Sequence, residues 1–81
     1  MPKTHDYRFL EEIGRRLINR REELGLTQEA VAIKSKVSPQ QLSKYELGLS
    51  DPPLSTLLRI TFALRMSATA LLMQTSVSAD K

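Results

Sequence analysis

The stretch GLTQEAVAIKSKVSPQQLSKYELG, residues 25–48, contains the start signals of two short helices in close succession. Thr27 offers a hydroxyl that can accept a hydrogen bond from the free amides of a helix start. Ser38 offers the same at a second start, followed by Pro39 at the first helical position and by Gln41 where a capping box needs it. The stretch therefore predicts helices over about 27–35 and 39–47, joined by a turn of about three residues.

The sequence before this stretch predicts one long helix. An apolar stripe recurs there at helical spacing, with Arg21 as its polar member, through Leu10, Ile13, Leu17 and Leu24. Gly25 then supplies the left-handed conformation in which many helices stop. We expect this first helix to run from about Tyr7 to Leu24.

Two further helices are expected after the stretch. Gly48 ends the preceding helix, and Ser55 and Ser67 are each expected to cap a helix, because apolar residues follow each of them at helical spacing. The last residues are small and polar, and we expect them to fray. No strand signal or internal repeat interrupts this order. The chain is therefore expected to be all-α, with a five-helix domain over residues 1–73 and a flexible tail over 74–81.

The composition is that of one small soluble domain. With 81 residues the chain has room for a single core, and without cysteine it has neither a disulfide nor a thiolate metal site. Its one histidine, His5, has no partner at metal-ligand spacing, so we expect no metal and no cofactor. No apolar run reaches the roughly 20 residues that cross a bilayer, and the N-terminus lacks a signal-peptide pattern. We expect a cytoplasmic protein that neither spans a membrane nor is exported.

The charge balance favours a polyanionic partner only weakly. Twelve lysines and arginines stand against nine aspartates and glutamates, and the excess is spread along the chain. Net charge alone therefore does not locate a binding face. No nucleophile stands with a base and no glycine-rich phosphate loop is present, so we expect that the protein is not an enzyme.

These residues resemble the Cro and phage-repressor helix-turn-helix family, which includes the xenobiotic-response-element regulators. The resemblance covers roughly residues 12–73 and implies a lambda-repressor-like bundle of five helices, of which the second and third dock on DNA. Lys36, Thr61 and Arg65 depart from the pattern, and many members carry a turn glycine at the first of these positions. The matching residues are segments 13–17, 25–28 and 37–38, with Arg21, Glu46, Gly48, Pro53, Leu57, Ile60, Ala63, Leu64, Leu71 and Leu72.

The resemblance assigns base reading to the start of the 39–47 helix. A surface glutamine or lysine is usually only solvated, but here such residues cluster where side chains reach base edges in the major groove. Glutamine can bridge adenine N6 and N7, and lysine can donate to guanine O6 and N7. Gln40 and Lys44 are expected to carry most of the readout. The full set of expected base contacts is Ser38, Pro39, Gln40, Gln41 and Lys44.

Phosphate contacts are expected mainly around the two helix starts. Gln28 could be an ordinary helix former, but a helix N-terminus presents free amides and a positive dipole end to an anion, so we favour a phosphate clamp. Arg16 and Arg20 are weaker candidates, because each has a glutamate at helical spacing with which it can pair. The expected phosphate contacts are Arg15, Thr27, Gln28, Lys36, Ser43 and Ser50.

Arg21 and Glu46 each interrupt the apolar face of a helix, so we expect both to have a structural role. The family pairs the positions of Arg21 and Glu46 in a partly buried ion pair between the first and third helices, which would orient the recognition helix. Tyr45 lies on the Leu42 side of the same helix, so we expect it in the core with its hydroxyl in solvent.

The small size of the DNA-contacting surface predicts a dimer. One such domain reaches about one half-site, which rarely suffices for specific binding at cellular salt. We therefore expect a homodimeric repressor that reads a pseudo-palindromic, double-stranded operator with half-sites about 10 base pairs apart. Interface candidates are Phe62, Met66, Leu71 and Met73, although Phe62 and Leu71 could equally be ordinary core.

A second class of function remains open at this point. The chain could be an interaction module, such as an antitoxin or phage accessory protein, whose main ligand is another protein and whose DNA binding is secondary. The presence of Gln28, Gln40 and Lys44 at their positions favours the DNA-binding regulator.

Overall fold

Local start and stop signals place five helices along residues 7–73, the part of the chain that the computed structural model describes. They are α1 (Tyr7–Glu23), α2 (Gln28–Ser35), α3 (Pro39–Glu46), α4 (Leu54–Ala63) and α5 (Ala68–Met73). Residues 7–73 contain no strand. The expectation of an all-α, five-helix chain is confirmed, whereas the expected tail over 74–81 lies outside the described residues.

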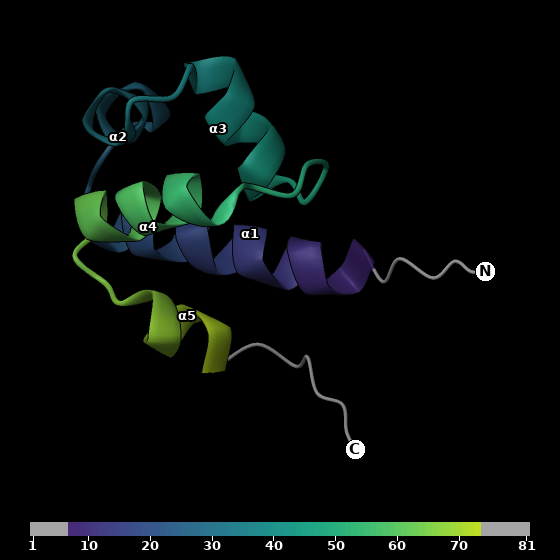
Figure 1. Ribbon diagram of the computed structural model, residues 1–81. Helices are drawn as coiled ribbons and strands as arrows, with labels where there is room; N and C mark the ends of the chain where they lie inside the picture. The colour runs from purple at the N-terminus through teal and green to yellow at the C-terminus, as the bar shows by residue number, and fades with distance from the viewer. Residues whose placement is uncertain (1–6, 74–81) are drawn as a thin grey trace.

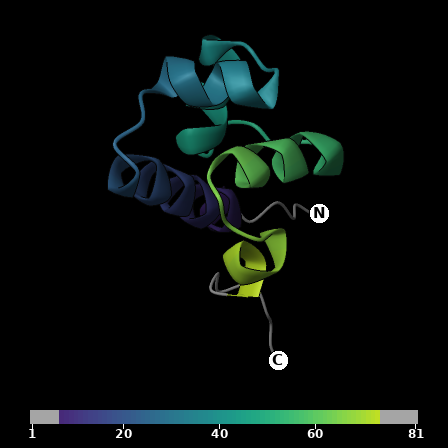
Figure 2. The ribbon, with the colours of Figure 1, turned by 90° about the vertical axis from the view of Figure 1, so that its left-hand side faces the viewer.

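The helices are arranged in levels around a shared core (Figure 1). α2 and α3 lie at the top of the view, α1 and α4 lie beneath them, and α5 lies at the bottom. α2 packs on α4, α3 packs on α1 and on α2, and α5 contacts both α1 and α4. Figure 2 shows from the side that α2 and α3 are at the opposite end of the molecule from α5. The two helices of the 25–48 stretch, α2 and α3, thus pack on α4 and α1.

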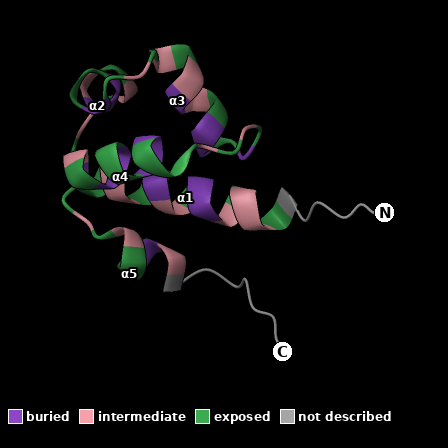
Figure 3. Cartoon of the chain, viewed as in Figure 1, coloured by how far each residue is buried: buried purple, intermediate pink, exposed green. Residues whose placement is uncertain are grey.

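The core is built from the apolar faces that the periodicity indicated. Each helix contributes a side chain that is fully or almost fully buried: Leu17, Val31, Leu42, Ile60 and Leu71. Figure 3 shows the buried positions on the inward sides of the helices and the exposed positions on their outer sides. Burying one such side chain stabilises the folded state by about 1.5–3 kcal/mol. The shared core therefore fixes how the short helices lie against one another.

Side-chain caps begin three helices where they were expected. Thr27 Oγ1 accepts a hydrogen bond from the amide of Ala30 at 3.0 Å, and Ser38 Oγ accepts one from the amide of Gln41 at 3.0 Å. Ser67 Oγ likewise accepts from a backbone amide in the first turn of α5, at 2.9 Å. Each hydroxyl satisfies an amide that has no partner inside its own helix, which is why these serines and threonine mark the helix starts.

Two expected details of the helix ends are wrong. α4 begins at Leu54 after Pro53 without a side-chain cap, so Ser55 lies inside the helix instead of capping it. Pro53 has φ −57° and ψ 152°, an extended conformation that leads into the helix without a capping hydroxyl. Gln41 does not complete the capping box: over residues 7–73 its side chain bonds to Ser50 Oγ, to which its nitrogen donates at 3.3 Å, and not to the amide of Ser38.

Lys36 ends α2 in the left-handed conformation, with φ 59° and ψ 42°. A side chain is strained there because its Cβ lies close to the following carbonyl oxygen, a strain that glycine lacks. Lys36→Gly should therefore raise the free energy of unfolding by about 0.5–1 kcal/mol, as measured by urea denaturation. This is the relief of strain less the free-energy cost of glycine's larger entropy in the unfolded state. Lys34→Gly is the matched control: Lys34 is an exposed helical residue, and glycine there should cost about 1 kcal/mol. Equal destabilisation by both variants would contradict the strain at Lys36.

Candidate nucleic-acid interface

The α3 helix has one buried and one exposed face. Leu42, Tyr45 and Glu46 are buried, whereas the side chains of Gln40 and Lys44 are exposed. Gln40 and Lys44 are four positions apart, so they are neighbours on the outward side of the helix. Neither side chain has a hydrogen-bond or ion-pair partner within residues 7–73. Both polar ends are therefore available to a ligand, and Tyr45 is buried as expected.

The beginning of α3 is tied to the loop that follows the helix. Ser38 is exposed and its hydroxyl serves as the helix cap, and Pro39 is half-buried at the first helical position. The hydrogen bond from Gln41 to Ser50 joins the first turn of α3 to the loop before α4. The structure thus brings several of the expected DNA contacts, from two separate segments, into one neighbourhood.

A buried ion pair attaches the last turn of α3 to α1. Arg21 Nε donates to Glu46 Oε2 at 2.7 Å, and Arg21 Nη2 donates to Glu46 Oε1 at 3.2 Å. The remaining nitrogen, Nη1, donates to the carbonyl of Leu26 at 3.0 Å. The arginine and glutamate side chains are only 15% and 3% exposed, so this bidentate pair is largely shielded from solvent. It is the pair that the family resemblance implied, and it fixes the orientation of α3 relative to α1.

Gln28, the first residue of α2, is the third member of this cluster. Its Nε2 donates to Glu46 Oε1 at 2.7 Å, so one carboxylate joins α1, α2 and α3. Sequence reasoning missed this contact, because the two residues are 18 positions apart and no local signal links them. An amide nitrogen carries two protons, and the bond to Glu46 uses one of them. The other remains at the half-buried start of α2.

The remaining expected phosphate contacts are not all brought together. Thr27 caps α2, Lys36 is exposed in the turn between α2 and α3, and Ser43 is half-buried on α3. Arg15 instead lines a cavity of about 150 Å³ with three other residues of α1. That cavity is formed by α1 alone and includes no residue of α2 or α3.

Two arginines hold the carboxyl ends of helices in a way that the sequence did not indicate. Arg20 Nε donates to the carbonyl of Leu64 at 2.9 Å, and its Nη2 donates to the carbonyl of Arg65 at 3.1 Å. Arg59 Nε donates to the carbonyl of Ser35 at 2.8 Å. A cation at this end of a helix satisfies free carbonyls and complements the helix dipole. Arg20 also pairs with the glutamate three positions later, as expected, so it is engaged within the fold.

The four expected interface residues have different surroundings. Leu71 is fully buried because α5 packs on α1 and α4, so it belongs to the core of one chain and offers no surface to a second. Phe62 is 86% exposed and is not core. Met66 is half-buried and lines the same cavity as Phe62. The side chain of Met73 lies outside the described part of the structure.

The part of the chain that the structure describes has neither a metal-binding cluster nor a membrane-spanning helix. Over residues 7–73, no three or more His, Cys, Asp and Glu side chains are grouped so that they could hold a metal ion. None of the helices in this range has the length and apolar character needed to cross a membrane.

Comparison with known proteins identifies relatives of the same architecture. The helix-turn-helix family HTH_3 matches residues 17–71. The clp gene regulator ClgR from C. glutamicum is 29% identical, with a TM-score of 0.80 over 89% of this chain and 92% of that one. The restriction-modification controller protein C.AhdI from Aeromonas hydrophila is 29% identical, with a TM-score of 0.74 over 76% of this chain and 94% of that one. No curated protein sequence matches.

A third similar structure is named for the same family. It is an HTH_3 family transcriptional regulator from Vibrio cholerae, 33% identical with a TM-score of 0.77 over 86% of this chain and 39% of that one. The family match over residues 17–71 includes the whole of α2, α3 and α4 and the turns between them. The chain therefore belongs to the Cro/C1-type helix-turn-helix family and has the fold of its DNA-binding transcriptional regulators.

Proposed function

We propose that the protein is a sequence-specific transcriptional regulator, a dimeric repressor that reads a pseudo-palindromic double-stranded operator with α3 in the major groove. The observation that carries this proposal is the exposed Gln40–Lys44 face of α3, opposite a face anchored by the Arg21–Glu46 pair. Family membership supports it, as do the names of the similar structures, a restriction-modification controller and gene regulators. Such a protein works at the nucleoid, in the cytoplasm of a bacterial or phage-infected cell.

In this proposal the start of α3 faces the base edges. Gln40 offers both a donor and an acceptor, which match adenine N7 and N6, and Lys44 donates to guanine O6 and N7. Pro39 makes apolar contact only, and Ser38 and Gln41 complete the set beside it. Each good contact discriminates between bases by about 1–3 kcal/mol. The two longest exposed side chains therefore set most of the sequence preference.

The DNA backbone is proposed to meet the start of α2. Free amides and the positive end of the helix dipole favour a phosphate there. Glu46 already holds the Gln28 amide at 2.7 Å, so its second proton can bind a phosphate without first having to order the side chain. The other proposed phosphate contacts are Thr27, Lys36, Ser43 and Ser50, with Arg15 as a more distant member on α1.

A homodimer supplies the second half-site of the operator. We propose that its interface involves α5 and its surroundings, where Leu72 is half-buried. Phe62 and Met66 share a cavity with two cations, and a twofold axis at that place would bring like charges together. The buried Leu71 and the cation-lined cavity thus leave the surface around Leu72 as the better interface.

Filter binding at two salt concentrations tests this function. A duplex recovered from a random pool should bind more tightly than a scrambled duplex, because base contacts add to phosphate contacts. Affinity should fall at least about a hundredfold between about 50 and 200 mM salt, since cationic contacts release counterions from DNA. Weak binding that does not depend on sequence would contradict the proposal and favour a protein-interaction module.

Two alanine variants separate base reading from phosphate binding. Gln40→Ala should lose about 1–3 kcal/mol on the preferred duplex and relax the preference at one base position of each half-site. Gln28→Ala should weaken all duplexes alike, because phosphates carry no sequence information. Binding to duplexes that differ at single base pairs measures both effects. Uniform losses on every duplex for both variants would remove the distinction between reader and clamp.

A further inference from the structure

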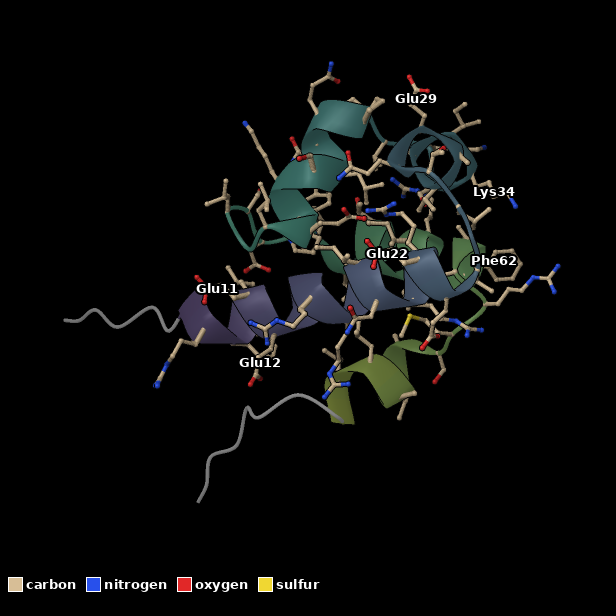
Figure 4. All side chains as sticks on the ribbon, turned by 180° about the vertical axis from the view of Figure 1, so that it is seen from behind. Glu11, Glu12, Glu22, Glu29, Lys34 and Phe62 are labelled. Atoms are coloured by element: carbon tan, nitrogen blue, oxygen red, sulfur yellow. The ribbon has the colours of Figure 1, made fainter. Side chains whose placement is uncertain are left out.

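An exposed aromatic side chain lies away from the recognition helix. Phe62 on α4 is 86% exposed and lines an open cavity of about 760 Å³, together with Ala63, Met66 and Ser67. Figure 4 shows Phe62 and Lys34 at one edge of the molecule, away from α3. None of the residues that line this cavity is a proposed DNA contact. Its volume and its mixture of apolar and charged lining residues are of the kind found at binding sites.

Two cations form the polar rim of the cavity. Lys34 of α2 and Arg65 of the turn after α4 both line it, and no carboxylate does. Neither side chain has a hydrogen-bond or ion-pair partner in the part of the chain that the structure describes. Glu23 lines the adjoining cavity that shares Met66, but it is paired with Arg20 at 3.2 Å. The cavity therefore presents an apolar floor beside unneutralised positive charge.

The backbone of the turn that carries Arg65 and Met66 is held in shape before anything binds. Arg65 has φ 55°, a left-handed conformation that strains a side chain, and its amide donates to the carbonyl of Phe62 at 3.1 Å. The amide of Met66 donates to the carbonyl of Thr61 at 3.0 Å, and Arg20 binds the carbonyl of Arg65. Backbone strain that the surroundings maintain is common at functional positions. Because the backbone of this turn is already ordered, a ligand that binds there loses less conformational entropy.

We propose that this cavity binds a segment of another protein in which an acidic side chain adjoins an apolar one. The apolar side chain packs on Phe62 and Met66, and the carboxylate pairs with Lys34 or Arg65. A second copy of this chain fits poorly, because a twofold contact would gather the cations of both copies around one axis. Duplex DNA fits poorly as well, because its sugar-phosphate backbone offers little apolar surface to cover an aromatic ring. The proposal does not depend on operator binding.

Selection from a library of random dodecapeptides tests the chemistry of the partner. Peptides displayed on phage are selected on the folded wild-type protein and counter-selected on Phe62→Ala, a variant that should fold because the ring is exposed. The recovered peptides are then titrated into isotope-labelled protein, and amide chemical shifts map where they bind. We expect a carboxylate within a few positions of a leucine, phenylalanine or methionine, and shifts centred on residues 62–67 and Lys34.

Matched variants make the outcome decisive. Phe62→Ala should weaken binding of the selected peptide at least about tenfold, and Lys34→Gln with Arg65→Gln should weaken it and remove its salt dependence. Ile33→Ala should change nothing, since Ile33 is 77% exposed beside Lys34 but does not line the cavity. Operator affinity should stay the same in all of these variants.

Several results would overturn the proposal. The first is the recovery of no peptide, and the second is the recovery of peptides that lack a carboxylate. The third is a selected peptide that shifts protein amide signals outside residues 62–67 and Lys34. Loss of self-association by Phe62→Ala in sedimentation would assign the cavity to a second copy. If Phe62→Ala or the Lys34→Gln, Arg65→Gln variant lost affinity for DNA, and no peptide bound the wild-type protein, the cavity would be assigned to DNA. Because operator binding is measured separately, the failure of this proposal is distinguishable from the failure of the proposed function.

Discussion

Replacing Arg21 with methionine is expected to lower the free energy of unfolding by about 3–5 kcal/mol. The change fills a similar volume but removes the bidentate partner of Glu46, whose side chain is 3% exposed. The Gln28 amide would then be the one remaining donor that the structure shows on this carboxylate. A buried charge without its counter-ion is among the most costly defects a small core can contain. Urea denaturation followed by circular dichroism at neutral pH measures the loss.

Two controls show whether the loss comes from the stranded carboxylate. Arg15→Met should change stability by less than about 0.5 kcal/mol, because Arg15 is exposed on the same helix. The double variant Arg21→Met, Glu46→Leu should recover most of the loss, since apolar replacement of a whole buried pair is often neutral. A single variant that loses under about 1 kcal/mol would mean that the pair does not hold α3. The same single variant should also bind operator more weakly, because α3 loses its anchor to α1.

Gly14→Ala is the second substitution for which we expect a large effect. A Cβ on Gly14 would overlap the carbonyl oxygen of Glu46 and lie 2.7 Å from both the carbonyl carbon of Glu46 and the carbonyl oxygen of Tyr45. These are backbone atoms at the end of α3, so they cannot turn aside as a side chain does. Either α1 and α3 separate or the overlap remains, and both weaken the core. We expect a loss of about 3 kcal/mol or more in the free energy of unfolding.

Asn19→Ala is the matched control for the glycine substitution. Asn19 is exposed on the same helix, and alanine has the higher helix propensity, so this variant should gain up to about 0.5 kcal/mol. Both variants are compared by the same urea denaturation experiment. If Gly14→Ala stabilised the protein as much as Asn19→Ala does, α1 and α3 would not approach as closely as the structure indicates.

The parts of the fold that the sequence predicted are those set by local chemistry. Thr27, Ser38 and Ser67 act on amides three positions later, so their hydroxyls could be placed from the sequence alone. Leu17 and Leu42 recur at helical spacing and are buried as that spacing indicates. The start of α4 was misplaced because a proline in an extended conformation can begin a helix without a hydroxyl cap.

The parts that could not be predicted depend on contacts between distant segments. Arg20 reaches the carbonyl of Leu64, 44 positions away, and a periodic pattern contains no information on such a pair. The burial of Leu71 depends on how α5 packs against α1 and α4, which the apolar pattern left open. The exposure of Phe62 depends on which face of α4 turns toward the core, and the pattern left that open as well.

In the candidate site, too, the features set by local sequence could be predicted and those set by distant contacts could not. The outward position of Gln40 and Lys44 follows from the amphipathic pattern of α3 alone. The Arg21–Glu46 pair was reached through the family resemblance, since its two residues are 25 positions apart. The bond from Gln28 to Glu46 had no signal of either kind. It alters the expected clamp from a free surface side chain to one that is held by a buried carboxylate.

Selection of duplexes from a random pool shows whether the exposed face of α3 reads bases. Wild-type protein and the double variant Gln40→Ala, Lys44→Ala are used in parallel. We expect wild-type protein to enrich two inverted half-sites with centres about 10 base pairs apart. The variant should fold but lose its preference at defined positions of each half-site. Enrichment of the same motif by both proteins, or of none by the wild type, would contradict base reading by α3.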